Sequence, residues 1–213
     1  MRKLAWLVIA VAVVTAFPCV AAAENFYAAI RGGPSHTPDS KEGIPGDREE
    51  QEYKLGFTGG GALGYSFPFG LRTEAEIGFL YTPVDKDGGR DVSGSYKTYL
   101  LMVNAYYDFK FPFFGPFKPY IGGGIGGARV NEDRQVFYET QGLKVPVDEW
   151  RTALAWQGRA GIGYDVNKWL DLSVGYRFVR VNGSTEKIGC CGPKVKYDDV
   201  NNHSVELGFA VKF

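Results

Sequence analysis

Apolar and polar residues alternate strictly along the segment HSVELGFAVKF at the end of this chain. One parity holds Val205, Leu207, Phe209, Val211 and Phe213, and the other holds Glu206, Gly208, Ala210 and Lys212. A period of two residues is that of a β-strand with one apolar and one polar face. The aromatic Phe213 at the apolar parity gains nothing in a soluble domain but can lie at the headgroup level of a membrane. The segment therefore indicates an apolar face that contacts lipid.

The same alternation divides the chain into eight segments that we expect to be strands. They cover residues 26–33, 53–67, 71–82, 96–110, 119–130, 153–166, 169–181 and 202–213. Short connections at 68–69, 111–117 and 167–168 alternate with long polar ones at 34–52, 83–95, 131–152 and 182–201. This order is typical of an all-β, eight-stranded antiparallel up-and-down transmembrane β-barrel with short periplasmic turns and long extracellular loops. Arg180 interrupts the alternation of its segment, where we expect the strand to leave the membrane or to bulge.

Alternation alone does not decide which face points inward, and a soluble lipocalin-like binder would place its apolar face inside. Three observations favour the opposite arrangement. The polar parity mixes charges with many glycines and alanines, as a narrow lumen requires. Aromatic residues gather at strand ends, including Phe67, Phe109 and Trp169 near the short turns and Tyr81 and Tyr99 near the long loops. The strands are also long, and a membrane strand needs about 9–11 residues.

The start of the chain resembles a secretory signal. Arg2 and Lys3 precede an apolar run too short to span a bilayer, and small residues at 21–23 end it. We therefore expect a cleaved signal peptide at residues 1–23 and an exported outer-membrane barrel domain at 24–213. The 24 Lys and Arg residues balance 24 Asp and Glu residues, so nothing in the charge suggests nucleic-acid binding.

Chemistry-bearing residues are sparse in the expected mature chain. Cys190 and Cys191 are adjacent in the segment GCCG, where either a strained disulfide in an oxidising compartment or a plain loop is possible. Their spacing forms no metal motif, and we expect no metal and no cofactor. His203 and Ser204 are neighbours, so their side chains point to opposite faces and cannot form a nucleophile and base pair. Catalysis is therefore not expected.

The segment PYIGGGIGGA at 119–128, together with the terminal strand ending in Phe213, resembles the OmpA/OmpX-type family of small outer-membrane barrels. The resemblance implies insertion by the barrel-assembly machinery, with Phe209, Val211 and Phe213 of the last strand as the assembly signal. It also implies a lumen filled by side chains. Barrels of this size that deacylate lipid carry His and Ser two residues apart on one face, and this chain departs from that pattern.

The polar parity predicts a network of charged side chains inside the barrel. Its members are Arg31, Arg72, Glu74, Glu76, Asp108, Arg159, Asp171, Arg177, Glu206 and Lys212. Heights counted from the short turns pair Arg177 with Glu206, Arg72 with Asp108 and Asp171 with Lys212, and they place Arg31, Glu76 and Arg159 in a middle layer with the first pair. Charges in so narrow a space must be paired or hydrated. The network is then either a plug that fixes the strand register or a gate of a narrow channel.

These observations predict a non-enzymatic protein of the bacterial cell outer membrane with a structural or surface-exposed, porin-like barrel. Its expected partners are outer-membrane lipids, lipopolysaccharide and the barrel-assembly machinery. A narrow channel gated by salt bridges is one alternative, and an adhesin or surface antigen with an unknown host ligand is another. The first long loop is rich in acidic residues, whereas the third is more apolar and either extends the barrel as a hairpin or forms an adhesive surface.

Overall fold

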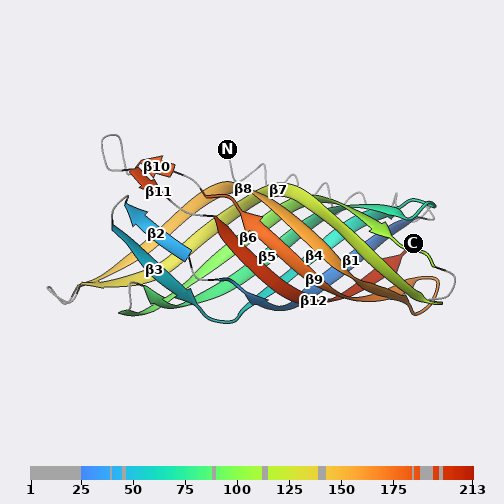
Figure 1. Cartoon of the computed structure of the whole chain (residues 1–213), viewed down its shortest axis with the longest axis horizontal. Coiled ribbons are helices and arrows are strands. Elements are labelled where there is room, and N and C mark those ends of the chain that lie inside the picture. The colour runs from blue at the N-terminus through green and yellow to red at the C-terminus, as the bar shows by residue number, and fades with distance from the viewer. Residues whose placement is uncertain are drawn as a thin grey trace.

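Antiparallel pairing closes eight long strands into a barrel (Figure 1). The computed structural model describes residues 25–38, 40–44, 47–87, 90–111, 115–138, 143–183, 185–187, 194–196 and 199–213. The barrel strands are β1 (Phe26–His36), β4 (Gly56–Ser66), β5 (Leu71–Asp87), β6 (Arg90–Asp108), β7 (Phe117–Tyr138), β8 (Leu143–Asp165), β9 (Leu170–Val181) and β12 (Val200–Lys212). Each pairs with the next, and β12 pairs with β1 to complete the circle. The predicted fold is therefore confirmed.

Four shorter strands lie beyond the barrel at the end opposite the C-terminus (Figure 1). They are β2 (Ser40–Ile44), β3 (Asp47–Tyr53), β10 (Thr185–Lys187) and β11 (Lys194–Lys196). β3 pairs with the far end of β5, and β11 pairs with β2, so these strands widen one side of the sheet. The prediction of plain long loops at 34–52 and 182–201 was wrong in this respect. A strand with polar residues at both parities lacks the alternation that identifies a strand, so its sequence resembles that of a loop.

The other two long connections are mostly strand as well. β5 and β6 continue to Asp87 and Arg90, which shortens the loop predicted at 83–95. β7 and β8 continue to Tyr138 and Leu143 in unbroken register, so the connection predicted at 131–152 is a hairpin that extends the barrel wall. Outside the membrane both faces of a strand can contact water, and the alternation that identified the lower strands is not required there.

The short connections at 68–69 and 167–168 are tight turns, as predicted, whereas part of the one at 111–117 lies outside the described residues. Gly70 has a φ of 96°, a left-handed conformation that side chains rarely adopt, and its N–H donates to the carbonyl of Phe67 over 3.1 Å. In the last short turn, the Oδ1 of Asn167 accepts hydrogen bonds from the N–H groups of Trp169 and Leu170 over 2.9 and 2.8 Å. These turns fix the register of the strands that they join.

The outer wall of the barrel is apolar. Val103 on β6 is 67% exposed, Ile125 on β7 is 67% exposed and Leu207 on β12 is 62% exposed. Apolar side chains cover the outer face of every barrel strand in this way, which only an apolar surrounding stabilises. The inferred lipid-facing parity is thus the exposed parity of the structure. The described residues include no helix long and apolar enough to cross a membrane.

Glycines on the inner face of β7 make room for side chains of β6. A Cβ atom on Gly122 would overlap the ring of Tyr106, which lies directly opposite it, and one on Gly124 would overlap the side chain of Asn104. Tyr120 lies in the same way against Gly161 on β8. The glycine-rich segment therefore lets large polar side chains lie flat against the wall of a narrow lumen.

Candidate functional site: the lumen of the barrel

A closed ring of ion pairs, here called the charge layer, crosses the middle of the lumen. Its members Glu76, Arg159, Arg177 and Glu206 come from β5, β8, β9 and β12. Glu76 lies 3.2 Å from Arg159 and 3.1 Å from Arg177, and Glu206 lies 3.0 and 3.2 Å from the same two guanidinium groups. These side chains are only 1–4% exposed. Two carboxylates and two guanidinium groups alternate, so the buried layer is neutral.

Neutral polar side chains satisfy the remaining groups of the charge layer. Asn104 and Gln157 donate to Oε2 of Glu76 over 2.8 and 3.0 Å. Arg177 donates to Gln157 over 2.7 Å, and Arg159 donates to the hydroxyl of Tyr106 over 2.6 Å. Asn104, Gln157 and Tyr106 were not among the predicted members of the network. Their inward parity was readable, but only the register across β5, β6 and β8 shows that Asn104 and Gln157 meet Glu76 and that Tyr106 meets Arg159.

A second group of charges, here called the lower cluster, lies on the short-turn side of the charge layer. Arg31 donates two hydrogen bonds to Glu74, over 2.6 and 2.8 Å. Arg72 lies 3.3 Å from Glu74 and 2.7 Å from Asp108, and Tyr27 donates to Glu74 over 2.6 Å. The structure thus brings Arg72 and Asp108 together, whereas Arg31 contacts Glu74 rather than the middle layer to which sequence analysis assigned it.

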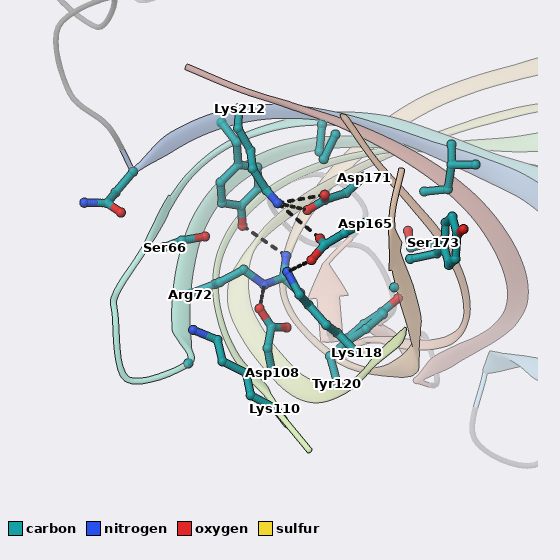
Figure 2. A pocket seen from close by; sticks show the side chains of 18 of the residues that line it. Ser66, Arg72, Asp108, Lys110, Lys118, Tyr120, Asp165, Asp171, Ser173 and Lys212 are labelled. Carbon is teal, nitrogen blue, oxygen red and sulfur yellow. Dashed lines mark hydrogen bonds and ion pairs between the residues drawn. The ribbon is translucent and has the colours of Figure 1, made fainter. Parts of the chain in front are cut away.

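The short-turn mouth of the lumen holds a cavity of about 270 Å³ lined by charged side chains (Figure 2). Lys212 lies 2.6 Å from Asp171 and 3.3 Å from Asp165, and Lys118 forms an ion pair with Asp165. Arg72 and Asp108 of the lower cluster lie at the inner side of this space. Lys118 and Asp165 were not among the predicted network residues, because their strands were expected to begin and end within one residue of them.

The far side of the charge layer is closed by apolar side chains, here called the apolar cap. It consists of Leu80, Tyr96, Leu100, Met102, Ala128, Val130, Ala155, Val179 and Val181. Leu100 and Met102 follow Asn104 along the inner face of β6 away from the short turns, and Val179 follows Arg177 on β9. The expectation of a polar lumen was therefore incomplete: apolar side chains fill part of its outer half, beside the buried polar side chains of Thr37, Thr82, Arg151 and Asn202.

Strand β9 does not bulge at Arg180. Of the two expectations for this position, a bulge or the end of the membrane-facing segment, the bulge was wrong. The pairing of β9 with β12 and with β8 passes through Arg180 without a shift. Its side chain lies on the outer face and forms an ion pair with Asp199, while Val179 and Val181 keep the inner parity and join the apolar cap. The interruption of the pattern marks the end of the lipid-facing stripe.

The remaining predicted residues lie outside the lumen or outside the described residues. Phe209, Val211 and Phe213 are exposed on the outer face of the last strand. His203 is also on the outer face, where its Nδ1 lies 2.5 Å from the hydroxyl of Tyr176, whereas Ser204 is buried in the lumen. Cys190, Cys191 and residues 1–23 lie outside the part of the chain that the structure describes.

Comparisons with known proteins agree on the fold. A family model described as "Outer membrane protein beta-barrel domain" matches residues 7–213. An uncharacterised protein of Brucella abortus is 29% identical over 201 residues, which span 75% of this chain and 69% of that protein. An outer membrane protein of Gluconacetobacter diazotrophicus is 26% identical over 197 residues, 84% of this chain and 52% of that protein. The crystal structure of Neisserial surface protein A has a TM-score of 0.56 at 21% identity, covering 88% of this chain and 97% of that one.

Proposed function

Because the chain belongs to the outer membrane protein β-barrel domain family and lies in the bacterial outer membrane, we propose that it is a non-enzymatic barrel with a sealed lumen and a structural, surface-exposed role. The observation that carries the proposal is the order of the lumen layers. Ions that enter the cavity at the short-turn mouth meet the neutral charge layer, and behind it the apolar cap.

Two different barriers act in series in such a lumen. An ion would have to break buried charge pairs, which costs several kcal/mol per ion left uncompensated. It would then have to pass the apolar cap and the buried polar side chains beside it, where an unpaired charge is again unfavourable. A gate needs a second arrangement of the network, but opening the charge layer alone leaves the apolar cap closed. The structure therefore supports a plug over a gated channel.

Planar-bilayer recording tests the sealed lumen. We expect the refolded protein to show no single-channel steps, and we expect Glu76→Ala and Leu100→Ala each to leave the conductance at the baseline, because one barrier remains in each variant. Heat-modifiable migration on a detergent gel verifies that each variant is folded. Steps in the unmodified protein that change in size or frequency in Glu76→Ala or Arg177→Ala would establish the gated channel instead.

A surface-binding role is the second candidate, and the extended strands favour it. β7 and β8 pair from Phe117 and Tyr164 as far as Tyr138 and Leu143, and β2 and β3 widen the same end of the barrel. Such a sheet beyond the membrane offers an ordered surface to an external ligand. Bacteria that display the protein are expected to adhere to host cells less strongly when residues 134–147 are replaced by a short turn, and unchanged adhesion would exclude this hairpin.

The first 23 residues and the last strand are the basis of a proposed assembly route. We propose that residues 1–23 direct export and are removed, and that the barrel-assembly machinery recognises the last strand through Phe209, Val211 and Phe213. Support comes from the exposed apolar stripe on β12, which is available before the strand pairs with β1. Lipids and lipopolysaccharide then surround the apolar wall.

A further inference from the structure

An aromatic ladder on the outer wall holds an arginine at its upper end. Phe79 on β5 and Tyr99 on β6 have ring centroids 5.3 Å apart, and Tyr99 stacks on Trp150 of β8 at 6.1 Å with an interplanar angle of 20°. The guanidinium carbon of Arg129 on β7 lies 4.4 Å from the centroid of the Trp150 ring. Four neighbouring strands therefore contribute to one exposed cation–π assembly.

The ladder lies where the lipid-facing band ends. Tyr99 is directly opposite Arg129 in the sheet. Towards the short turns, the next outward residues beyond this pair are Leu101 and Val103 on β6, and Gly127 followed by Ile125 on β7, all exposed. In the other direction the next outward residue of β6 is Lys97. Aromatic rings followed by cations are what an interface between acyl chains and charged headgroups stabilises.

Arg129 differs from the other arginine of this outer rim. Arg180 on β9 is also on the outer face, but it forms an ion pair with Asp199. Among the side chains that the structure describes, which exclude those of residues 132–149, no carboxylate lies within ion-pair distance of Arg129, and its guanidinium group contacts the face of Trp150. A guanidinium stacked through its flat face keeps its in-plane N–H groups available, and these match the oxygens of a phosphate.

We propose that Arg129, held in place by Trp150, binds a phosphate group of an outer-leaflet lipid headgroup, the phosphorylated lipid A part of lipopolysaccharide. The inference rests on the proposed function for its orientation, with the short turns in the periplasm. Stacking on Trp150 fixes the guanidinium before the lipid arrives, so less conformational freedom is lost on binding. The ladder below it contacts the acyl chains of the same leaflet.

Native mass spectrometry of the refolded full chain with diphosphoryl lipid A tests the proposal. We expect Arg129→Gln to lower the affinity about fivefold, the effect of one basic residue at a membrane surface. Dephosphorylated lipid A should bind the unmodified protein and Arg129→Gln equally weakly. Trp150→Leu should show an intermediate loss, because the charge stays but its position is no longer fixed. Arg180→Gln is the matched control and should retain the affinity of the unmodified protein.

Two results would overturn the inference. One is an unchanged preference of Arg129→Gln for the phosphorylated lipid. The other is complete displacement of lipid A by millimolar inorganic phosphate, which would identify a site for a free anion rather than a lipid headgroup. Failure of the sealed lumen is a separate outcome. A barrel that conducts ions but loses lipid A binding in Arg129→Gln would contradict the proposed plug and support the lipid site.

Discussion

At the scale of single residues, each buried carboxylate that the structure describes in the lumen contacts two guanidinium groups. Glu76 and Glu206 share Arg159 and Arg177, and Glu74 lies between Arg31 and Arg72. Sharing keeps the layer neutral and leaves every charge with a partner on a different strand. The side chains therefore act as cross-links that hold one register around the barrel, and the loss of one carboxylate affects two cations at once.

Glu76→Gln should lower the free energy of unfolding by about 3–5 kcal/mol, because Arg159 and Arg177 then share the single carboxylate of Glu206 in a buried layer. Urea unfolding in lipid vesicles, followed by tryptophan fluorescence, measures the change. Asp171→Asn removes a carboxylate from the partly exposed ion pairs at the short-turn mouth of the lumen, where a loss of about 1 kcal/mol or less in the free energy of unfolding is expected. Equal losses in the two variants would show that burial does not set the strength of these pairs.

Phe213→Ser should separate assembly from stability. The ring of Phe213 is exposed at the short-turn rim, and its backbone N–H donates to the carbonyl of Phe26 over 3.0 Å whatever the side chain is. The variant should therefore refold in vesicles as well as the unmodified chain, while the amount of folded protein in the outer membrane of cells falls. Quantitative heat-modifiable gels of both preparations make the comparison. A normal amount in cells would contradict the assigned assembly signal.

β7 shows at the scale of the element how a strand can be shaped by its neighbour. Its inward positions Gly122, Gly124 and Gly126 lie opposite Tyr106, Asn104 and Met102 of β6, whose side chains occupy the space that Cβ atoms would need. Its outward Gly127 has open space around the position of a Cβ. The same residue type thus has a packing role at Gly122, Gly124 and Gly126 and none at Gly127.

Gly122→Ala should destabilise the barrel by about 1–3 kcal/mol, since the added methyl group must displace the ring of Tyr106 or the backbone of Ala105. Gly127→Ala on the same strand should be neutral or slightly stabilising, because its Cβ meets no atom and the alanine lowers the entropy of the unfolded chain. Urea midpoints of the two variants in vesicles provide the test. A loss of stability in Gly127→Ala as large as that in Gly122→Ala would point to a general cost of side chains on β7.

At the scale of the whole molecule, a lipid-facing barrel encloses a lumen that is partly filled by buried apolar side chains. This combination explains which features of the fold could be predicted from the sequence. The alternation of apolar and polar residues, together with the short turns, identified the eight strands. Because the height of a residue in the barrel can be counted from the nearest turn, the sequence also predicted that Arg177 lies beside Glu206 and Arg72 beside Asp108. The apolar cap was missed because Leu100 and Met102 stand next to apolar outward residues, so no alternation marks their face. The hairpin of β7 and β8 was one of the two expectations for the third long loop. The short strands β2, β3, β10 and β11 were missed, because a strand outside the membrane needs no alternation of apolar and polar residues.

Cysteine labelling of intact cells should establish the direction of the barrel that these features require. In a background with Cys190→Ser and Cys191→Ser, Gln135→Cys lies on the extended hairpin of β7, and Lys168→Cys lies in the exposed turn between β8 and β9. A membrane-impermeant maleimide should label the first variant in intact cells and the second only after the outer membrane is permeabilised. This difference in labelling is expected because the cavity and its charged mouth face the periplasm, whereas the apolar cap lies towards the cell exterior. The reverse pattern would place the Arg129 ladder in the inner leaflet and remove the basis for its binding of lipid A.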